Sequence, residues 1–150
     1  MKLLIPPPIQ TLFSAILMWV ISKYLNQANF NLNGMNGFAL VCLISGGIII
    51  GLGINKFRQT KTTINPHKPN EASSLVVGGI YRYTRNPMYF GLLIILFSIA
   101  LYLKNFISFL VIPLYMLFIT KYQIIPEEEA LENIFGEEYK SYKNKVRRWI

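Results

Sequence analysis

The sequence predicts an all-α integral membrane protein with about four transmembrane helices, forming a single domain over residues 1–150. Hydrophobic residues make up 53% of the 150 residues, and the mean hydropathy is +0.38. Such a chain has the length of one domain but is more apolar than an ordinary soluble protein. Its apolar residues gather in four blocks that carry almost no charge. The predicted spans are residues 9–25, 37–54, 87–103 and 105–121, with a loop at 55–86 and a tail at 122–150.

The first block follows three consecutive prolines, Pro6 to Pro8, which suit a rigid lead-in to the first turn of a helix. Lys2 precedes the same block, as the charged start of a cleavable signal sequence would. Residues 26–30, directly after the block, lack the small-residue pattern of a cleavage site. We therefore expect the first block to be retained as a helix.

The second block has no polar face, which argues against a buried helix of a soluble bundle. Within it, Gly47 and Gly51 have the four-residue spacing that lets two membrane helices approach closely, with Gly46 and Gly53 nearby. We interpret this pattern as helix packing rather than chemistry.

The third and fourth blocks are separated only by the turn Leu103-Lys104-Asn105, so we expect them to form an antiparallel hairpin. Pro113 is expected to kink the fourth helix, either as plain architecture or to open a cavity. The hairpin returns the chain to the membrane face from which it started. The loop and the tail should therefore meet at that face.

The charge distribution predicts the orientation in the membrane. The formal net charge is +8, and the basic residues concentrate in the loop at 55–86 and after the fourth block. The segment between the first two blocks carries no charge, and the hairpin turn carries only Lys104. The positive-inside rule then places both termini and the loop in the cytoplasm. Because these cations flank membrane spans, their expected partner is the anionic bilayer surface and not nucleic acid.

The loop and the tail hold the residues with chemical character. Prolines and glycines exclude one long helix in the loop, and a loop of this length in so small a protein suggests a function. In the tail, Pro126 followed by three glutamates is typical of a helix start, because carboxylates suit the positive end of a helix dipole. Apolar positions then recur as in two short amphipathic helices lying along the membrane interface.

Two motifs stand out. Residues 79–91 read G-x-Y-x-x-x-R-N-P-M-Y-x-G, and residues 127–142 read E-E-x-x-L-x-x-x-F-G-x-x-Y-x-x-Y. Together they resemble the isoprenylcysteine carboxyl methyltransferase family, to which membrane phospholipid methyltransferases are related. The resemblance extends from Thr62 to Ile150. It implies methyl transfer from S-adenosylmethionine to a lipophilic small-molecule or prenylated acceptor presented from the lipid phase.

The resemblance also implies a cofactor pocket built by the loop, the start of the third helix and the acidic pair. The residues carried over as cofactor-binding are Ser73, Ser74, Leu75, Val76, Tyr81, Asn86, Pro87, Met88, Tyr89 and Glu127. Arg85 and Glu128 are the expected catalytic residues, Glu128 as a candidate base. Aromatic faces suit a sulfonium, and a carboxylate suits an ammonium or ribose hydroxyls. Taken singly, each residue also fits a plain helix start or an interfacial belt, and it is their joint spacing that favours a pocket.

The chain departs from the family pattern at three positions. Gln123 stands where the prenylcysteine enzymes are expected to use an arginine for the acceptor's carboxylate, although Lys121 or Arg85 could compensate. Asn86 replaces a histidine found in many relatives, and Arg147 replaces a frequent proline, which would extend the last helix.

Other chemistries are not indicated. His67 is the only histidine and Cys42 is distant from it, so we assign no metal. Gly51-Leu52-Gly53 lies in an apolar block and not after a parallel strand, which excludes the soluble methyltransferase motif. Three functions stay open: O-methylation of an isoprenoid-linked carboxylate, N-methylation of a phospholipid or other amine, and a catalytically silent protein that binds a membrane partner. The sequence does not set the oligomeric state.

Overall fold

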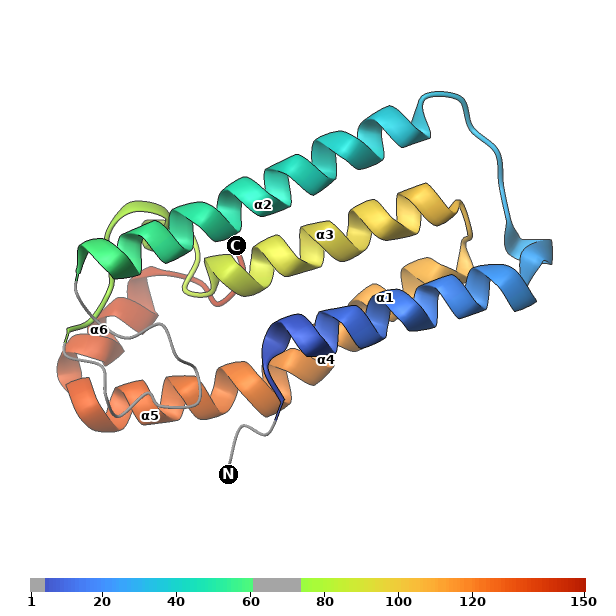
Figure 1. Ribbon diagram of the computed structural model, residues 1–150. Coiled ribbons are helices and arrows are strands. Elements are labelled where there is room, and N and C mark those ends of the chain that lie inside the picture. Colours follow the sequence, from blue (N-terminus) through green and yellow to red (C-terminus); the bar gives the residue numbers. More distant parts are fainter. Residues whose placement is uncertain (1–4, 61–73) are drawn as a thin grey trace.

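The computed structural model describes residues 5–60 and 74–150, and these residues are arranged as helices with short connections (Figure 1). The predicted all-α class is confirmed, since the described residues contain no strand beyond an isolated bridge between Asn29 and Asn105. The α-helices are α1 (Pro7–Tyr24), α2 (Met35–Gln59), α3 (Pro87–Leu103), α4 (Val111–Ile119), α5 (Ile125–Phe135) and α6 (Glu137–Lys145). The shorter turns are η1 (Asn26–Ala28), η3 (Gly79–Arg82), η4 (Ile107–Leu110) and η5 (Thr120–Ile124).

Four helices lie side by side along the long axis of the molecule, as Figure 1 shows. Helix α2 packs along α3, and α1 packs against α3 and α4. Helices α5 and α6 lie at one end of this bundle, beside the end of α2 and the start of α3. We call this end the loop end, because the segment that enters α3 also lies there.

Two helical segments have the length and apolar character needed to cross a bilayer, Met35–Gln59 and Ile107–Phe135, with mean hydropathies of 2.4 and 1.6. Helix α3 is apolar but shorter, at 17 residues, and α1 has 18. Side chains of α2 such as Leu40, Val41 and Ile48 are more than half exposed. An exposed apolar surface of this kind suits contact with lipid.

The close packing of α2 against α3 uses different glycines from those predicted. A Cβ atom on Gly46 would lie 2.8 Å from the carbonyl oxygen of Gly91, and one on Gly91 would lie 2.7 Å from the carbonyl oxygen of Gly46. At Gly47 and Gly51 a Cβ atom would meet nothing within 4 Å. Close glycine packing was predicted correctly, but the glycines that face α3 are the neighbouring Gly46 and Gly53, the latter with a Cβ position 2.9 Å from Met88 Cγ.

The fourth helix does not end where the predicted span ends. Pro126 lies in the first turn of α5 with Glu127 and Glu128, as predicted, but α5 continues directly from the π-helical turn η5, so helical structure is continuous from Ile107 to Phe135. Proline has no backbone N–H to donate, and a π turn is a place where the helical hydrogen-bond ladder already changes. Pro113 lies in the first turn of α4, directly after the 3₁₀ turn η4. The first charge after α4 is Lys121, and we take the apolar span to end there.

The opposite end of the bundle is fixed by Asn105, which is fully buried in the hairpin turn. Its amide nitrogen donates to the carbonyl oxygen of Leu25 at 2.9 Å and to Asn29 Oδ1 at 2.7 Å. Its side-chain oxygen accepts from the backbone N–H of Ser108 at 3.0 Å. One side chain therefore ties the end of α1 to the α3–α4 hairpin.

Candidate functional site

The two sequence motifs lie together at the loop end, as the hairpin prediction requires. Val76 and Tyr81 from the segment before α3 form one buried cluster with Tyr139 and Tyr142 of α6. The Tyr142 hydroxyl donates to the carbonyl oxygen of Tyr81 at 2.7 Å. Burial raises the pKa of Tyr81, Tyr139 and Tyr142, so these phenols stay neutral. The loop and the tail are thus held together by an aromatic core.

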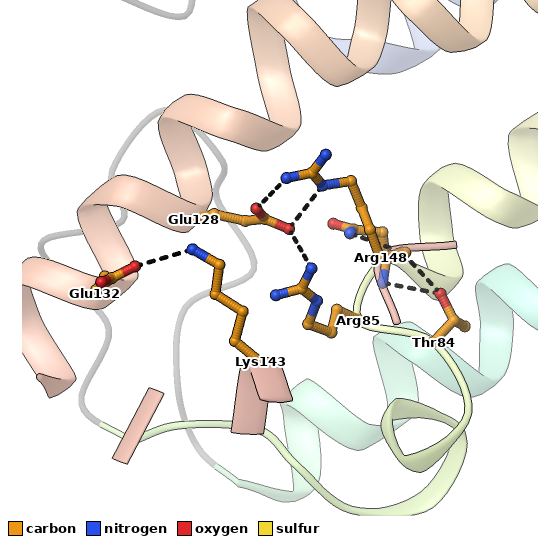
Figure 2. Close-up of polar contacts among 7 residues, drawn as sticks. Thr84, Arg85, Glu128, Glu132, Lys143 and Arg148 are labelled. Atoms are coloured by element: carbon orange, nitrogen blue, oxygen red, sulfur yellow. Dashed lines mark hydrogen bonds and ion pairs between the residues drawn. The ribbon is translucent and has the colours of Figure 1, made fainter. Parts of the chain in front are cut away.

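Glu128 lies at the centre of an ion-pair network, drawn in Figure 2. Arg148 approaches both carboxylate oxygens, with Nε 3.0 Å from Oε1 and Nη2 2.7 Å from Oε2. Arg85 Nη2 lies 3.2 Å from Oε1. The Glu128 side chain is only 6% exposed and that of Arg85 only 8%, so this carboxylate is buried between two guanidinium groups. Its hydrogen bonds in turn raise the pKa of Arg148.

The segment after α6 closes against the residues that enter α3. The carbonyl oxygen of Arg148 accepts from Thr84 Oγ1 at 3.2 Å and from Asn86 Nδ2 at 3.0 Å (Figure 2). The backbone N–H of Arg85 donates to the carbonyl oxygen of Arg147 at 3.0 Å. Helix α6 ends at Lys145 and Val146 is extended, so the expectation that Arg147 extends the helix was wrong. We call residues 146–149 the C-terminal strap.

A second polar group surrounds Glu127, one residue before Glu128. Tyr89 donates its hydroxyl to Glu127 Oε1 at 2.5 Å, and Gln123 Nε2 donates to the same oxygen at 3.2 Å. Burial raises the pKa of Glu127 to about 7, although the hydrogen bonds from Tyr89 and Gln123 oppose that rise. Glu127 lies beyond Lys121 and therefore outside the apolar span. Its carboxyl group is thus poised to gain or lose a proton near neutral pH.

Two further groups at this end have unsatisfied polar atoms. Within residues 5–60 and 74–150, the buried atoms Tyr81 Oη, Arg85 Nε and Arg85 Nη1 have no hydrogen-bond partner. Buried polar groups in proteins are almost always paired, so these unpaired atoms single out this end of the molecule as a candidate binding region. A phenol hydroxyl and two guanidinium N–H groups would bind an anionic or hydrogen-bonding ligand.

Comparison with known proteins identifies the family to which the chain belongs. The model of a family described as phospholipid methyltransferase matches residues 35–138, which is more than half of the chain. The chain belongs to the phospholipid methyltransferase family. That family includes the isoprenylcysteine carboxyl methyltransferases, so the resemblance noted in the sequence is confirmed.

Individual relatives agree with the phospholipid methyltransferase family. A protein from Schizosaccharomyces pombe named protein-S-isoprenylcysteine O-methyltransferase is 35% identical over 88 residues, which are 59% of this chain and 37% of that protein. A Dictyostelium discoideum protein of the same name is 29% identical over 106 residues, 71% of this chain and 45% of that protein. A Haemophilus influenzae protein described as uncharacterized is 46% identical over 63 residues, 42% of this chain and all of that protein.

The matched regions span less than half the length of the two named methyltransferases. No solved structure matches the chain. Membership of the phospholipid methyltransferase family, together with two helical segments that could cross a bilayer, supports association of the protein with a membrane.

The structure brings together most of the residues carried over from this family. Several of them lie at the loop end: Val76, Tyr81, Arg85, Tyr89 and Glu127. Asn86 and Pro87 begin α3, and Met88 is half-buried in its first turn. Leu75 is packed against the Val76 cluster. Ser74 Oγ donates to the carbonyl oxygen of Thr60 at 3.3 Å, and Ser73 lies outside the described residues.

Three residues that lie at the loop end or contact its polar groups were not predicted from the sequence: Thr84, Arg148 and Gln10. Thr84 is only 3% exposed, and its hydroxyl both accepts from the Asn86 N–H at 3.1 Å and donates to the strap. Arg148 was missed because it follows Arg147 in a basic tail, and a charged residue in such a tail is usually exposed to solvent. Gln10 lies on α1, far in sequence from both motifs, and its Nε2 lies 3.5 Å from Gln123 Oε1, a contact that no local pattern marks. Among the described residues, no group of three or more potential metal ligands occurs.

Proposed function

We propose that this protein transfers a methyl group from S-adenosylmethionine to a small lipidic or isoprenoid-linked acceptor. The observation that carries the proposal is the meeting of both family motifs at the loop end, around Glu127 and Arg85, where some buried polar atoms have no partner among the described residues. Membership of a methyltransferase family supports the reaction class. The identity of the methyl donor and of the acceptor is part of this proposal.

The proposed membrane arrangement has four spans, formed by α1, α2, α3 and the first part of the Ile107–Phe135 segment. The loop end would face the cytoplasm, together with both termini. The clustering of basic residues in the loop and tail supports this orientation. It would place the site at the membrane interface, where a cofactor can arrive from water and an acceptor from lipid.

The residues that would hold the donor are those with matching chemistry. Arg85 Nε and Nη1 suit its carboxylate, and Glu127 suits its ammonium or its sulfonium. Tyr81 and Tyr89 offer aromatic faces beside these groups. We further propose that the segment Ser73 to Val76 and the Asn86-Pro87-Met88 start of α3 line the same pocket. When bound, S-adenosylmethionine supplies an electrophilic methyl group.

Glu127 and Glu128 would have different roles. Glu128, paired with Arg85 and Arg148, would orient the Arg85 guanidinium and lock the strap in place. Glu127 contacts neutral partners and has a pKa of about 7, which makes it the better candidate for accepting a proton. An acceptor carboxylate needs no such base, whereas an ammonium acceptor must lose a proton before it can attack.

N-methylation of an amine is therefore the second candidate function. It is favoured by Gln123, which is only 1% exposed and replaces the expected cationic partner of an acceptor carboxylate. A catalytically silent protein that binds a membrane partner is the third, and it would not bind the methyl donor.

Calorimetric titration of S-adenosylmethionine into the detergent-purified protein tests the proposal. We expect wild type to bind and Glu127→Gln to bind about 10-fold to 100-fold more weakly, as is usual when a charge-assisted hydrogen bond is lost. Glu138→Gln, at an exposed position of α6, is the matched control and should bind as wild type does. Absence of binding by folded wild-type protein would rule out the methyltransferase proposal and leave the silent function.

A further inference from the structure

Gln10 connects helix α1 to the proposed site. The start of α1 lies beside the junction of α4 and α5, as Figure 1 shows. Gln10 Nε2 donates to the carbonyl oxygen of Ile5 at 2.7 Å and lies 3.5 Å from Gln123 Oε1. Gln123 belongs to the π-helical turn η5, and its Nε2 donates to Glu127 Oε1 at 3.2 Å. Two side-chain amides therefore connect α1 to the Glu127 carboxyl group.

The orientation of the Gln10 amide is fixed by its neighbours. Ile5 and Gln123 both present oxygen atoms to Gln10 Nε2, and these oxygens are hydrogen-bond acceptors. Turning the amide around would place Gln10 Oε1 opposite the same two oxygens. The observed orientation is kept even though Gln10 Oε1 is buried without a partner among the described residues. Gln10 therefore presents an N–H group to Gln123.

That N–H group in turn fixes the amide of Gln123. Gln123 is only 1% exposed, so solvent offers it few alternative partners. The reversed orientation would set the amide nitrogens of Gln10 and Gln123 against each other and direct Gln123 Oε1 at Glu127. An ionised carboxylate repels such an oxygen, whereas a protonated carboxyl group can donate to it. The orientation set by Gln10 thus favours the ionised form of Glu127.

Ionisable groups of several elements lie around Glu127: Tyr81, Arg85, Tyr89, Glu128 and Arg148. Both guanidinium groups pair with Glu128, and no ion pair within the described residues includes Glu127. Burial raises the pKa of Glu127 to about 7, and the neighbouring charge of Glu128 adds to that rise. Hydrogen bonds from Tyr89 and Gln123 lower it. The loss of one such donor would therefore change how much of Glu127 is ionised at neutral pH.

We propose that Gln10 is a positioning residue for methyl transfer: through Gln123 it holds Glu127 in the ionised form that a cationic methyl donor requires. A carboxylate attracts the ammonium and the sulfonium of S-adenosylmethionine, and a neutral carboxyl group does not. The inference rests on the proposed function and adds α1 to its donor site. Helix α1 precedes residue 35, where the family match begins, so the family motifs do not include Gln10.

Titration of Glu127 in the ligand-free, detergent-purified protein tests the hydrogen bonds from α1. Infrared difference spectra between each protein and its own Glu127→Gln counterpart, recorded between about pH 5 and about pH 9, isolate the carboxyl band of Glu127. We expect half-titration near pH 7 in wild type. In Gln10→Leu it should lie about half a pH unit to one pH unit higher, which corresponds to the loss of one hydrogen bond.

A second variant at the same position should act in the opposite direction. Gln10→Lys keeps a donor for Gln123 Oε1 and adds a positive charge, so half-titration of Glu127 should move to lower pH. A variant that only loosened the packing of α1 would not reverse the sign in this way. Thermal unfolding checks that each variant is folded, and Gln10→Lys keeps the test decisive if Gln10→Leu does not fold.

Thr11→Val is the matched control on α1. Thr11 Oγ1 pairs with the Tyr115 hydroxyl at 2.9 Å, so this variant removes a contact between α1 and α4 one residue away from Gln10. It has no contact with Gln123 to lose, and it should leave the titration of Glu127 unchanged.

Calorimetric titration of S-adenosylmethionine at several pH values tests the role toward the donor. Donor affinity should fall as the pH falls and Glu127 gains its proton. In Gln10→Leu the same curve should lie at higher pH, so binding should be about twofold to fivefold weaker at neutral pH and equal to that of wild type at alkaline pH. A purely structural defect would weaken binding by a similar factor at every pH.

An unchanged Glu127 titration in both Gln10 variants would overturn the inference, as would an equal shift in Thr11→Val. Donor binding that Gln10→Leu weakens equally at every pH would overturn it as well. A shifted titration in protein that binds no S-adenosylmethionine rejects the methyltransferase proposal and leaves Gln10 as the residue that controls the charge of Glu127.

Discussion

Glu127 and Glu128 are neighbours in α5 but have opposite electrostatic surroundings. Glu128 lies between two guanidinium groups, and Glu127 receives hydrogen bonds only from the neutral groups of Tyr89 and Gln123 within the described residues. Consecutive residues of a helix point in directions about 100° apart, so the two carboxylates reach different neighbours. The sequence motif treats them as a pair, whereas the structure separates an ion-paired residue from one that can titrate.

Replacing Glu128 by glutamine should destabilise the fold. Arg85, which is almost fully buried, would lose its anionic partner, and removal of one member of a buried ion pair costs about 3 kcal/mol or more. Thermal unfolding in detergent measures the effect. Glu132→Gln removes the partly exposed pair with Lys143, 3.1 Å apart, and should cost less than about 1 kcal/mol. Equal losses in the two variants would contradict the assignment of Glu128 as a buried anchor.

Glu127 should make the stability of the ligand-free protein depend on pH. Its pKa is raised from 4.5 to about 7 on folding, so the folded state holds this proton more tightly than the unfolded state. The free energy of unfolding should therefore fall as the pH rises from about 4.5 to about 7 and then level off. Melting temperatures of wild type and Glu127→Gln across this range provide the test. Parallel pH profiles for the two proteins would exclude the raised pKa.

At the scale of elements, the uncharged apolar blocks predicted where helices lie but not which face of each helix is in contact. The second apolar block is apolar all round, so its sequence contains no signal that distinguishes Gly46 from Gly47 as the residue facing α3. The partner contact with Gly91, 45 residues later, makes that choice. In the same way, Pro126 and its glutamates predicted the first turn of α5 correctly, but no residue pattern signalled the π-helical turn η5 that joins α5 to α4.

The contact between α2 and α3 gives a matched pair of substitutions. Gly46→Ala places a methyl group 2.8 Å from the Gly91 carbonyl oxygen, and because that neighbour is backbone the helices must separate, at a cost of about 1–3 kcal/mol. Gly47→Ala enters open space and should be neutral or stabilising by about 0.5–1 kcal/mol. Unfolding of both variants in the same detergent compares them. Similar losses would show that the two helices pack in another register.

At the scale of the whole molecule, composition and charge were sufficient for the class and for the meeting of the two motifs. An antiparallel hairpin of two apolar blocks must bring the residues before it and after it to one end, which is why the site could be expected from the sequence. Contacts made by backbone atoms could not be predicted from the sequence of apolar blocks and charges. The strap binds Thr84, Arg85 and Asn86 through the carbonyl oxygens of Arg147 and Arg148, and no residue type signals such contacts.

The four-span arrangement predicts which segments are accessible from each side of the membrane. In a Cys42→Ser background, single cysteines at Gln27 and at Lys140 would lie at opposite ends of the bundle. A membrane-impermeant maleimide added to intact cells should label the Gln27→Cys variant. The Lys140→Cys variant should be labelled only after the cells are permeabilised. A Gln59→Cys control, at the end of α2, should behave as Lys140→Cys does. Labelling of Gln27→Cys and Lys140→Cys from the same side would contradict four spans.

The strap also sets the order in which the protein can assemble during synthesis. The residues that enter α3 hydrogen-bond to partners about 60 residues further along the chain, beyond the hairpin and both tail helices. When α3 emerges from the ribosome, those partners have not yet been made. The contacts of α2 with α3 can therefore form before the loop end is closed, which requires both tail helices to have been synthesised.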